Sequence, residues 1–302
     1  MNVLAERWHI GDVTIHRIVE MALSSDIMQR LIPDASPQRL SELPWLRPHF
    51  VDEGGRMSGS IHALIVETPD RLIVVDTCVG NDKTRKNPDF NALQSSFLQD
   101  FSAAGFTPER VDTVLCTHLH IDHVGWNTVL RDGRWEPTFP NARYLFGETE
   151  FAHWNREDHG ALERLDVEAV IADSVRPIFD AGLVDLVSTQ HKVCDEARLI
   201  STPGHTPGHV SVLIESKGES ALITGDFLHH PCQFARAHWP SSPDHDPNLN
   251  QQTRRDVYKR FADTSTLLIG THFASPTAGR LVSDGDTYRF DAALPSNEQN
   301  SA

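Results

Sequence analysis

The sequence predicts an α/β fold for this chain of 302 residues. Short apolar segments rich in branched aliphatic residues alternate with segments in which apolar residues recur at helical spacing. Four of the apolar segments lead directly into a histidine or an aspartate. Because α/β folds tend to keep functional residues at the carboxyl ends of buried strands, we expect a functional site built from these strand ends.

The expected strands follow one another along most of the chain. Residues 7–20 alternate as in a pair of strands joined by a Gly-Asp turn, and residues 61–67 and 71–76 form a hairpin. Later strands are expected at 111–116, 142–146, 198–202, 210–215, 220–224 and 266–270.

Helical spacing of apolar residues appears in three segments. Residues 90–104 and 161–180 show it clearly, and a further helix is expected near 250–262. Residues 147–160 are expected to begin a helical crossover. They contribute Phe151 and Trp154, which we expect to line a substrate pocket.

The chain is expected to form a single domain, 1–302, because no linker divides it. Residues 22–58 are rich in Leu, Ile, Met, Pro and Trp but have no clean periodicity. An exposed apolar arm of this kind could cover a pocket as a lid or mediate homodimerisation. The alternative is an irregular loop that packs against the rest of the chain.

Composition and charge exclude several classes of function. The 42 acidic residues outnumber the 27 basic ones, and a net charge of −15 disfavours nucleic acid or an anionic membrane as partner. No apolar run has the length of a membrane span, and no signal peptide is visible, so we expect a cytoplasmic protein. The four cysteines stand far apart, and we expect them to be reduced and not to bind metal.

Residues 117–123 carry the densest set of potential metal ligands. They read Thr-His-Leu-His-Ile-Asp-His and contain His118, His120, Asp122 and His123. Imidazole and carboxylate are groups that Zn²⁺ and its neighbours prefer. In extended backbone every second side chain shares a face, so His118 and His120 point the same way. One ion could not take all four ligands from so short a segment, whereas two ions could share them.

Three later strands also end in candidate ligands. One of them leads through a Pro-Gly turn to His205, another to Asp226 and a third to His272. The repeated Thr-Pro-Gly-His offers His209 as a second candidate beside His205. Chance placement among 17 histidines is the alternative, but the repeated order of strand and then ligand argues against it.

The whole pattern resembles the metallo-β-lactamase-fold hydrolase superfamily, whose signature is H-x-H-x-D-H followed by a later His, Asp and His. The resemblance extends from about residue 60 to residue 275. It implies an αββα sandwich of two mixed β-sheets flanked by helices. It also implies two divalent metal ions per chain, for which we expect Zn²⁺, with Mn²⁺, Fe²⁺ and Co²⁺ as alternatives.

The resemblance assigns a role to each candidate ligand. It places His118, His120 and His205 on one ion, Asp122, His123 and His272 on the other, and Asp226 as a bridge between them. It also implies that Asp76 orients the ligands by hydrogen bonding, and that His205 rather than His209 binds metal. We expect His209 to be a structural hydrogen-bonding residue.

A hydrolytic reaction follows from such a centre. A hydroxide that bridges two ions about 3.5–4 Å apart can attack a carbonyl or phosphoryl group that one ion polarises. Asp226, Asp122 and His229 are the expected catalytic residues, with Asp226 relaying a proton to the leaving group. No serine or cysteine nucleophile is required.

The later motifs resemble the methyl-parathion-hydrolase-like and lactonase-like branch, at 225–231, 239–247 and 270–280. Acyl-homoserine lactonases often carry a tyrosine three positions after the bridging aspartate, and His229 stands there in this chain. We expect His229 to contact the substrate or its leaving oxygen and Trp239 to line the pocket. Ester or lactone hydrolysis is the expected reaction. Phosphotriester hydrolysis is the first alternative, followed by a glyoxalase-II-like thioesterase or a non-catalytic metal-binding sensor.

Overall fold

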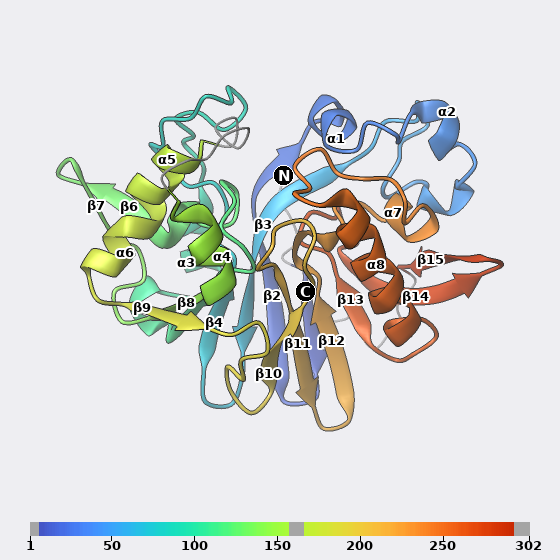
Figure 1. The fold of residues 1–302 in the computed structure, drawn as a ribbon. Helices are drawn as coiled ribbons and strands as arrows, with labels where there is room; N and C mark the ends of the chain where they lie inside the picture. Colours follow the sequence, from blue (N-terminus) through green and yellow to red (C-terminus); the bar gives the residue numbers. More distant parts are fainter. Residues whose placement is uncertain (1–5, 157–165, 293–302) are drawn as a thin grey trace. The chain divides into compact units, whose positions relative to one another are not determined.

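The computed structural model describes residues 6–156 and 166–292, which fall into two compact units (Figure 1). The first unit comprises Met1–Arg7, Val13–Met21 and Ile61–Thr189, and the second comprises Trp8–Asp12, Ala22–Ser60 and Gln190–Ala302. Each unit has one large sheet of mixed parallel and antiparallel strands, which confirms the predicted α/β class. Within the described residues, no helix has the length and hydropathy needed to cross a membrane.

The sheet of the first unit carries the first set of candidate ligands at its centre. Its strands neighbour one another in the order β2 (Val13–Leu23), β3 (Gly59–Glu67), β4 (Leu72–Val75), β5 (Thr113–Leu115), β8 (Arg143–Gly147) and β9 (Val184–Val187). β3 and β4 are antiparallel, whereas β4, β5, β8 and β9 run parallel. All residues of β4 and β5 are buried, as expected for parallel strands covered on both faces.

Helices and a small hairpin complete the first unit. α4 (Glu148–Trp154) packs on β8 and β9, and its acidic first turn and His153 in its last turn suit the helix dipole (Figure 1). The remaining elements are α3 (Phe97–Ala103), α5 (Val167–Val170), a π-helical turn (Ile171–Val175), α6 (Arg176–Asp180), the hairpin β6 (Thr128–Arg131) and β7 (Arg134–Pro137), and 3₁₀ turns at Pro108–Arg110 and Gly125–Asn127.

A buried lysine lies among these elements. The Lys83 ammonium donates to Thr128 Oγ1 at 2.6 Å and to the Asp173 carbonyl at 3.1 Å, and it lies 3.6 Å from the centre of the Trp135 ring. Asp173 itself forms two hydrogen bonds with Arg85, at 2.6 and 2.9 Å. Burial lowers the pKa of Lys83 from 10.5 to about 7, although the Asp173 carboxylate acts in the opposite direction.

Stability is therefore expected to rise with pH because of Lys83. Between about pH 7 and pH 10.5 the unfolded chain holds this proton more strongly than the folded chain, so the free energy of unfolding increases across that window. We expect a gain of about 1–4 kcal/mol from pH 7 to pH 9.5. Lys83→Met should remove this gain while Arg85 still neutralises Asp173. Urea unfolding of both proteins at the two pH values tests this, and equal pH dependence in both would contradict it.

The sheet of the second unit carries the later candidate ligands. Its strands neighbour one another in the order β10 (Ala197–Ser201), β11 (Val210–Ser216), β12 (Glu219–Ile223), β13 (Leu267–Ile269), β14 (Ala278–Asp284) and β15 (Thr287–Asp291). Only the pair β12 and β13 is parallel, so the described chain segments that follow these two strands start at the same edge of the sheet.

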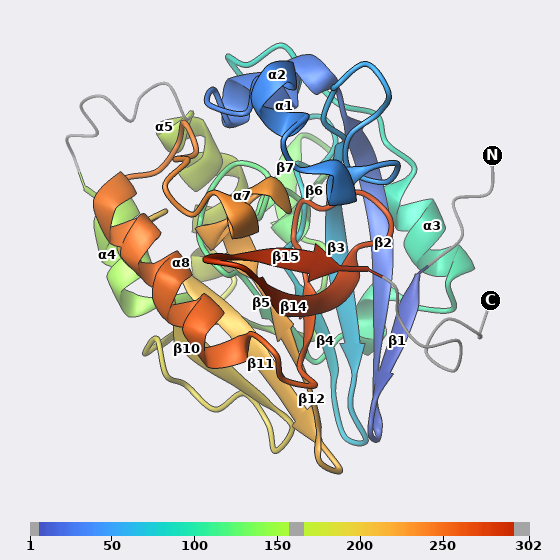
Figure 2. The ribbon, with the colours of Figure 1, turned by 90° about the vertical axis from the view of Figure 1, so that its right-hand side faces the viewer.

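Several helices belong to the second unit. α7 (Cys232–Ala235) packs on β15 (Figure 2). α8 (Pro247–Phe261) begins at Asp246, whose carboxylate accepts from two backbone N–H groups, and Pro247 suits the first helical position. The other elements are β1 (Arg7–Ile10), α1 (Ser25–Leu31), α2 (Pro37–Leu40) and 3₁₀ turns at Pro44–Leu46 and Gly225–Phe227.

Most of the predicted strands are confirmed within one or two residues, but one helix was predicted too long. The helix expected at 90–104 begins only at Phe97. Ala92 has a φ of 50°, which a right-handed helix cannot contain, and its N–H donates to the Lys83 carbonyl. For the helix expected at 161–180, residues 161–165 lie outside the described residues, and helical turns cover the rest from Val167 onward.

The irregular segment 22–58 folds as short helices and turns. Four of its large apolar side chains, those of Met28, Ile32, Leu46 and Phe50, are at most 1% exposed. This burial matches the alternative of a packed irregular loop. Its role as a lid or a dimerisation arm stays a prediction, as does the single domain.

Candidate metal centre

The first candidate ligands follow the end of β5 in the first unit. Asp76, directly after β4, accepts hydrogen bonds from the Thr117 backbone N–H at 2.7 Å, the Thr117 hydroxyl at 2.9 Å and His123 Nδ1 at 2.9 Å. The other ring nitrogen of His123, Nε2, points away from Asp76 and lies 3.7 Å from an Asp122 carboxylate oxygen. Asp76 therefore hydrogen-bonds one of the candidate ligands, and its role in orienting a metal ligand stays a prediction.

His118 and His120 form a close pair beside this group. His118 Nε2 lies 3.0 Å from His120 Nδ1, and the Thr117 hydroxyl contacts His118 Nδ1 at 3.1 Å. Two nitrogens bound to one tetrahedral zinc ion at 2.0–2.1 Å would be separated by about 3.4 Å. The observed separation is close to that value, so the pair is suited to share one ion.

A carboxylate surrounded by imidazoles forms the second candidate group, within the second unit. Asp226 Oδ2 lies 3.1 Å from His272 Nε2, 3.0 Å from His229 Nε2 and 3.7 Å from His205 Nε2. The potential ligand atoms of His205, Asp226 and His229 all lie within 4.8 Å of one another. Within this unit, three of the predicted site residues, Asp226, His229 and His272, thus meet directly with His205 beside them.

The hydrogen bonding of His272 fits a metal ion at this position. Its Nδ1 faces the Ser60 carbonyl oxygen at 3.1 Å while its Nε2 faces the Asp226 carboxylate. Both neighbours are acceptors, and a neutral imidazole carries only one N–H. If Nδ1 donates its proton to the Ser60 carbonyl, Nε2 has no proton and faces the Asp226 carboxylate as one acceptor against another. A metal ion bound by both Nε2 and Asp226 would satisfy these two acceptors. The residues present therefore fit a divalent metal.

The backbone of Asp226 is held by His209. His209 Nε2 accepts from the Asp226 backbone N–H at 2.7 Å, and Nδ1 contacts the Thr202 carbonyl at 2.9 Å. Both ring nitrogens thus hold backbone groups, which is the structural hydrogen-bonding role predicted for His209. Gly225 must be a glycine here because its φ is 60° and a Cβ atom would lie 2.5 Å from His209 Nε2.

Gly225→Ala is expected to lower the free energy of unfolding by about 2–4 kcal/mol, since it combines backbone strain with a clash against a buried hydrogen-bonded ring. Gly218→Ala is the matched control, because Gly218 has a φ of 84° but nothing within 4 Å of its Cβ position. It should cost only about 1 kcal/mol. Denaturant unfolding measures both, and equal losses would show that the clash with His209 is relieved.

His229 is fully buried between two polar groups. Its Nδ1 lies 2.7 Å from the Ser241 hydroxyl, opposite the contact of Nε2 with Asp226. Burial lowers the pKa of His229 to about 4, although the Asp226 carboxylate acts in the opposite direction. His229 is therefore neutral near pH 7. Its placement beside Asp226 as a third potential ligand was not expected from the sequence.

Sequence reasoning also missed several residues that support the ligands. Asp244 accepts from His205 Nδ1 at 2.9 Å. Burial raises the pKa of Asp244, but the His205 hydrogen bond and the nearby charge of Arg254 outweigh it and lower the value to about 2. Glu150 accepts from the Leu119 backbone N–H at 3.1 Å and so braces the segment of His118 and His120. No strand precedes Asp244, and therefore no sequence signal marked it.

The three predicted pocket residues occupy different places. Trp154 is 3% exposed, and its ring packs edge-on against His120 with 5.2 Å between centroids. Phe151 packs on Phe179 at 4.5 Å. Trp239 is 1% exposed and lies beneath the Arg39 guanidinium. Contact of these residues with a substrate stays a prediction.

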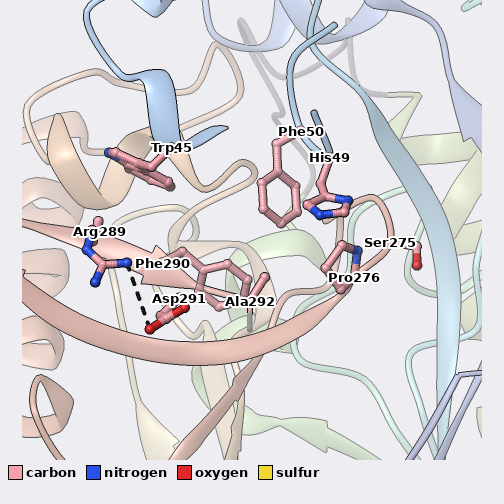
Figure 3. Close-up of a pocket in the computed structure, with 9 residues that line it drawn as sticks. All are labelled: Trp45, His49, Phe50, Ser275, Pro276, Arg289, Phe290, Asp291 and Ala292. Carbon is pink, nitrogen blue, oxygen red and sulfur yellow. Dashed lines mark ion pairs between the residues drawn. The ribbon is translucent and has the colours of Figure 1, made fainter. Parts of the chain in front are cut away.

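One pocket of about 500 Å³ opens within the second unit (Figure 3). Figure 3 shows the aromatic rings of Trp45, Phe50 and Phe290 around it, with Arg289 and Asp291 paired at its edge at 3.8 Å. His49, Ser275, Pro276 and Ala292 complete the lining. None of the residues predicted to bind substrate or metal lines this pocket.

Comparison with known proteins identifies the family. Residues 57–272 match the family model described as the metallo-beta-lactamase superfamily. The chain belongs to this superfamily. The match covers the histidine-rich segment and extends to His272, and it confirms the fold that the sequence resemblance implied.

Two curated proteins are similar to part of this chain. It is 24% identical over 175 residues to an N-acyl homoserine lactonase of Bacillus thuringiensis, covering 54% of this chain and 61% of the relative. It is 26% identical over 182 residues to a probable metallo-hydrolase of Mycobacterium tuberculosis, covering 56% and 57%. The aligned part therefore spans only about three-fifths of these superfamily members.

Two solved structures superpose over nearly the whole chain. The hydrolase AbOPH, of the beta-lactamase superfamily, has a TM-score of 0.79 and 26% identity, covering 97% of this chain and 98% of that one. AidC, described as a dizinc quorum-quenching lactonase, has a TM-score of 0.78 and 20% identity, covering 97% of each chain. At this identity, the similarity to AidC shows the fold alone.

Proposed function

We propose that this protein is a dinuclear-metal hydrolase that cleaves an ester or lactone bond. One observation carries the proposal: the Asp226 carboxylate oxygen lies within 3.0–3.7 Å of three buried imidazole nitrogens. A carboxylate placed in this way suits a bridge between two metal ions. The segment His118–His123 supplies the further ligands that a second ion requires, in a chain that belongs to a superfamily of this signature.

The proposed ligands are those expected from the sequence. One ion is assigned to His118, His120 and His205, the other to Asp122, His123 and His272, with Asp226 as the bridge. When bound, two Zn²⁺ ions would supply Lewis-acid activation of water and of the substrate carbonyl. Asp76 keeps His123 in the tautomer with Nδ1 protonated, through its 2.9 Å contact.

Side chains of this protein are proposed to transfer the proton and to stabilise the leaving group. Asp226 accepts a proton and passes it to the leaving oxygen. His229 is neutral near pH 7. With its Nδ1 accepting from the Ser241 hydroxyl, its single proton is on Nε2 beside Asp226, where it can be donated to a leaving oxygen. Asp122, 17% exposed in its side chain, is more accessible than His123 beside it and is the second carboxylate proposed for the reaction.

An ester or lactone is the proposed substrate class. Two similar proteins are named as lactonases, the B. thuringiensis relative and AidC. Buried imidazoles suit an uncharged substrate, and the net charge of −15 disfavours a polyanionic one.

The test is kcat/KM of the zinc-loaded protein on aliphatic lactones, aryl esters and a dialkyl aryl phosphotriester. We expect lactones or esters to be preferred by more than about a hundredfold, or roughly 2.7 kcal/mol of transition-state discrimination. Preference for the phosphotriester would replace the proposed substrate class. Absence of turnover on the whole panel would contradict the proposed function.

A further inference from the structure

We propose that Asp244 is a positioning residue for the metal centre, which fixes the tautomer and direction of His205. The inference rests on the proposed function only in taking His205 as a metal ligand. The Asp244 carboxylate accepts from His205 Nδ1 at 2.9 Å, and both side chains are completely buried. Because the carboxylate can only accept, the proton of the imidazole stays on Nδ1, and Nε2 keeps its lone pair for a metal.

Two hydrogen bonds and one ion pair, from separate positions, hold the carboxylate in place. The Ser241 backbone N–H and the Asn250 side chain each donate to it at 2.9 Å. Arg254 Nη2 lies 3.5 Å from its second oxygen. A buried carboxylate that accepts these two hydrogen bonds and pairs with a cation is held as a rigid anion, and a rigid anion can impose one orientation on its histidine.

Arg254, on α8, connects this carboxylate with the Asp226 segment. Its Nε donates to the Phe227 carbonyl at 2.6 Å, one residue after Asp226, and its Nη1 donates to the Trp239 carbonyl at the start of the Asp244 turn. Ser241, within the same turn, contacts His229 Nδ1. The turn 239–244 thus controls the ring orientation of both His205 and His229.

The first unit contains a corresponding arrangement. There Asp76 accepts from His123 Nδ1 at 2.9 Å, the distance also found between Asp244 and His205. The sequence analysis expected only Asp76 in such a role. The structure assigns the same task to Asp244 in the second unit, so each unit carries its own carboxylate that orients a histidine.

Zinc affinity of Asp244→Asn is the decisive measurement. Titration against a chromophoric chelator should show a loss of 10–100-fold in affinity for the weaker-bound zinc ion. Asp244→Glu should recover part of it. Glu67→Gln is the matched control, because Glu67 also accepts from a histidine, His16 at 2.8 Å, but no candidate ligand is involved. Zinc affinity within twofold of the wild type for Asp244→Asn would overturn the proposal.

A second measurement covers the case in which Asp244→Asn does not fold. Long-range ¹⁵N–¹H NMR of the metal-free wild-type protein, with His205→Gln to assign the signal, reports the tautomer of His205. We expect the proton on Nδ1, and a proton on Nε2 would overturn the proposal. Neither measurement uses turnover. A wild type that binds zinc as expected but hydrolyses nothing would therefore contradict the proposed function and leave the role of Asp244 intact.

Discussion

Asp226→Ala is expected to lower kcat/KM by about a thousandfold or more, which corresponds to about 4 kcal/mol of transition-state stabilisation. The carboxylate lies between the Nε2 atoms of His229 and His272, at 3.0 and 3.1 Å. Its removal takes away the proposed bridge and the group proposed to carry the proton. We therefore expect zinc content to fall below two ions per chain in the same variant, measured by elemental analysis.

Asp195→Ala is the control for this change. Asp195 is also an acidic residue of the second unit, but its side chain is 89% exposed and pairs with the nearby Lys192. We expect unchanged activity and metal content. Unchanged kcat/KM in Asp226→Ala would refute the assignment of Asp226 as the bridging ligand.

Removal of metal is expected to abolish activity and to lower the melting temperature. An ion that binds only the folded state at a thousand times its Kd stabilises that state by about 4 kcal/mol. For a chain of 302 residues the expected decrease in Tm on chelation is about 6 °C for one such ion. Scanning calorimetry with and without EDTA measures it, and added Zn²⁺ should restore both activity and Tm.

The Asp226→Ala variant provides the control for the chelation experiment. Because it is expected to hold less metal, EDTA should shift its Tm by less than that of the wild type. A chelated wild-type protein that keeps its activity would argue against metal-dependent chemistry of any kind at this site. A Tm that does not respond to EDTA would show that the metal does not support the fold.

Local patterns were sufficient for the strands that lead to the ligands. β4 and β5 are short runs that are buried throughout, and burial on both faces makes such runs nearly continuous in apolar residues. The last three residues of β12 are apolar and buried in the same way. The family motif predicted that Asp76 orients ligands by hydrogen bonding but named no partner, and the structure pairs Asp76 with His123 at 2.9 Å. In contrast, β14 and β15 have mixed burial and no clear alternation, and the sequence analysis did not find them.

Helix length was less predictable than strand position. Phe90 and Phe97 belong to a helical pattern in the sequence, but the residues between them pair with the preceding loop, as the bond from the Ala92 N–H to the Lys83 carbonyl shows. The Ala92 N–H therefore bonds to the preceding loop instead of to a carbonyl within a helix. Periodicity alone contains no information about such a contact.

The amino-acid sequence alone was enough to predict the α/β class, the superfamily and the candidate ligands, because these depend on residue types and spacings within short segments. The partners of those ligands depended on the fold. His272 meets the Ser60 carbonyl across 212 positions, and His205 meets Asp244 across 39. His209 became a backbone-holding residue because Asp226 lies against it. The packing of distant segments decides which atom accepts each histidine proton. A hydrogen bond depends on a donor–acceptor distance of about 3 Å and not on the separation of the two residues along the chain.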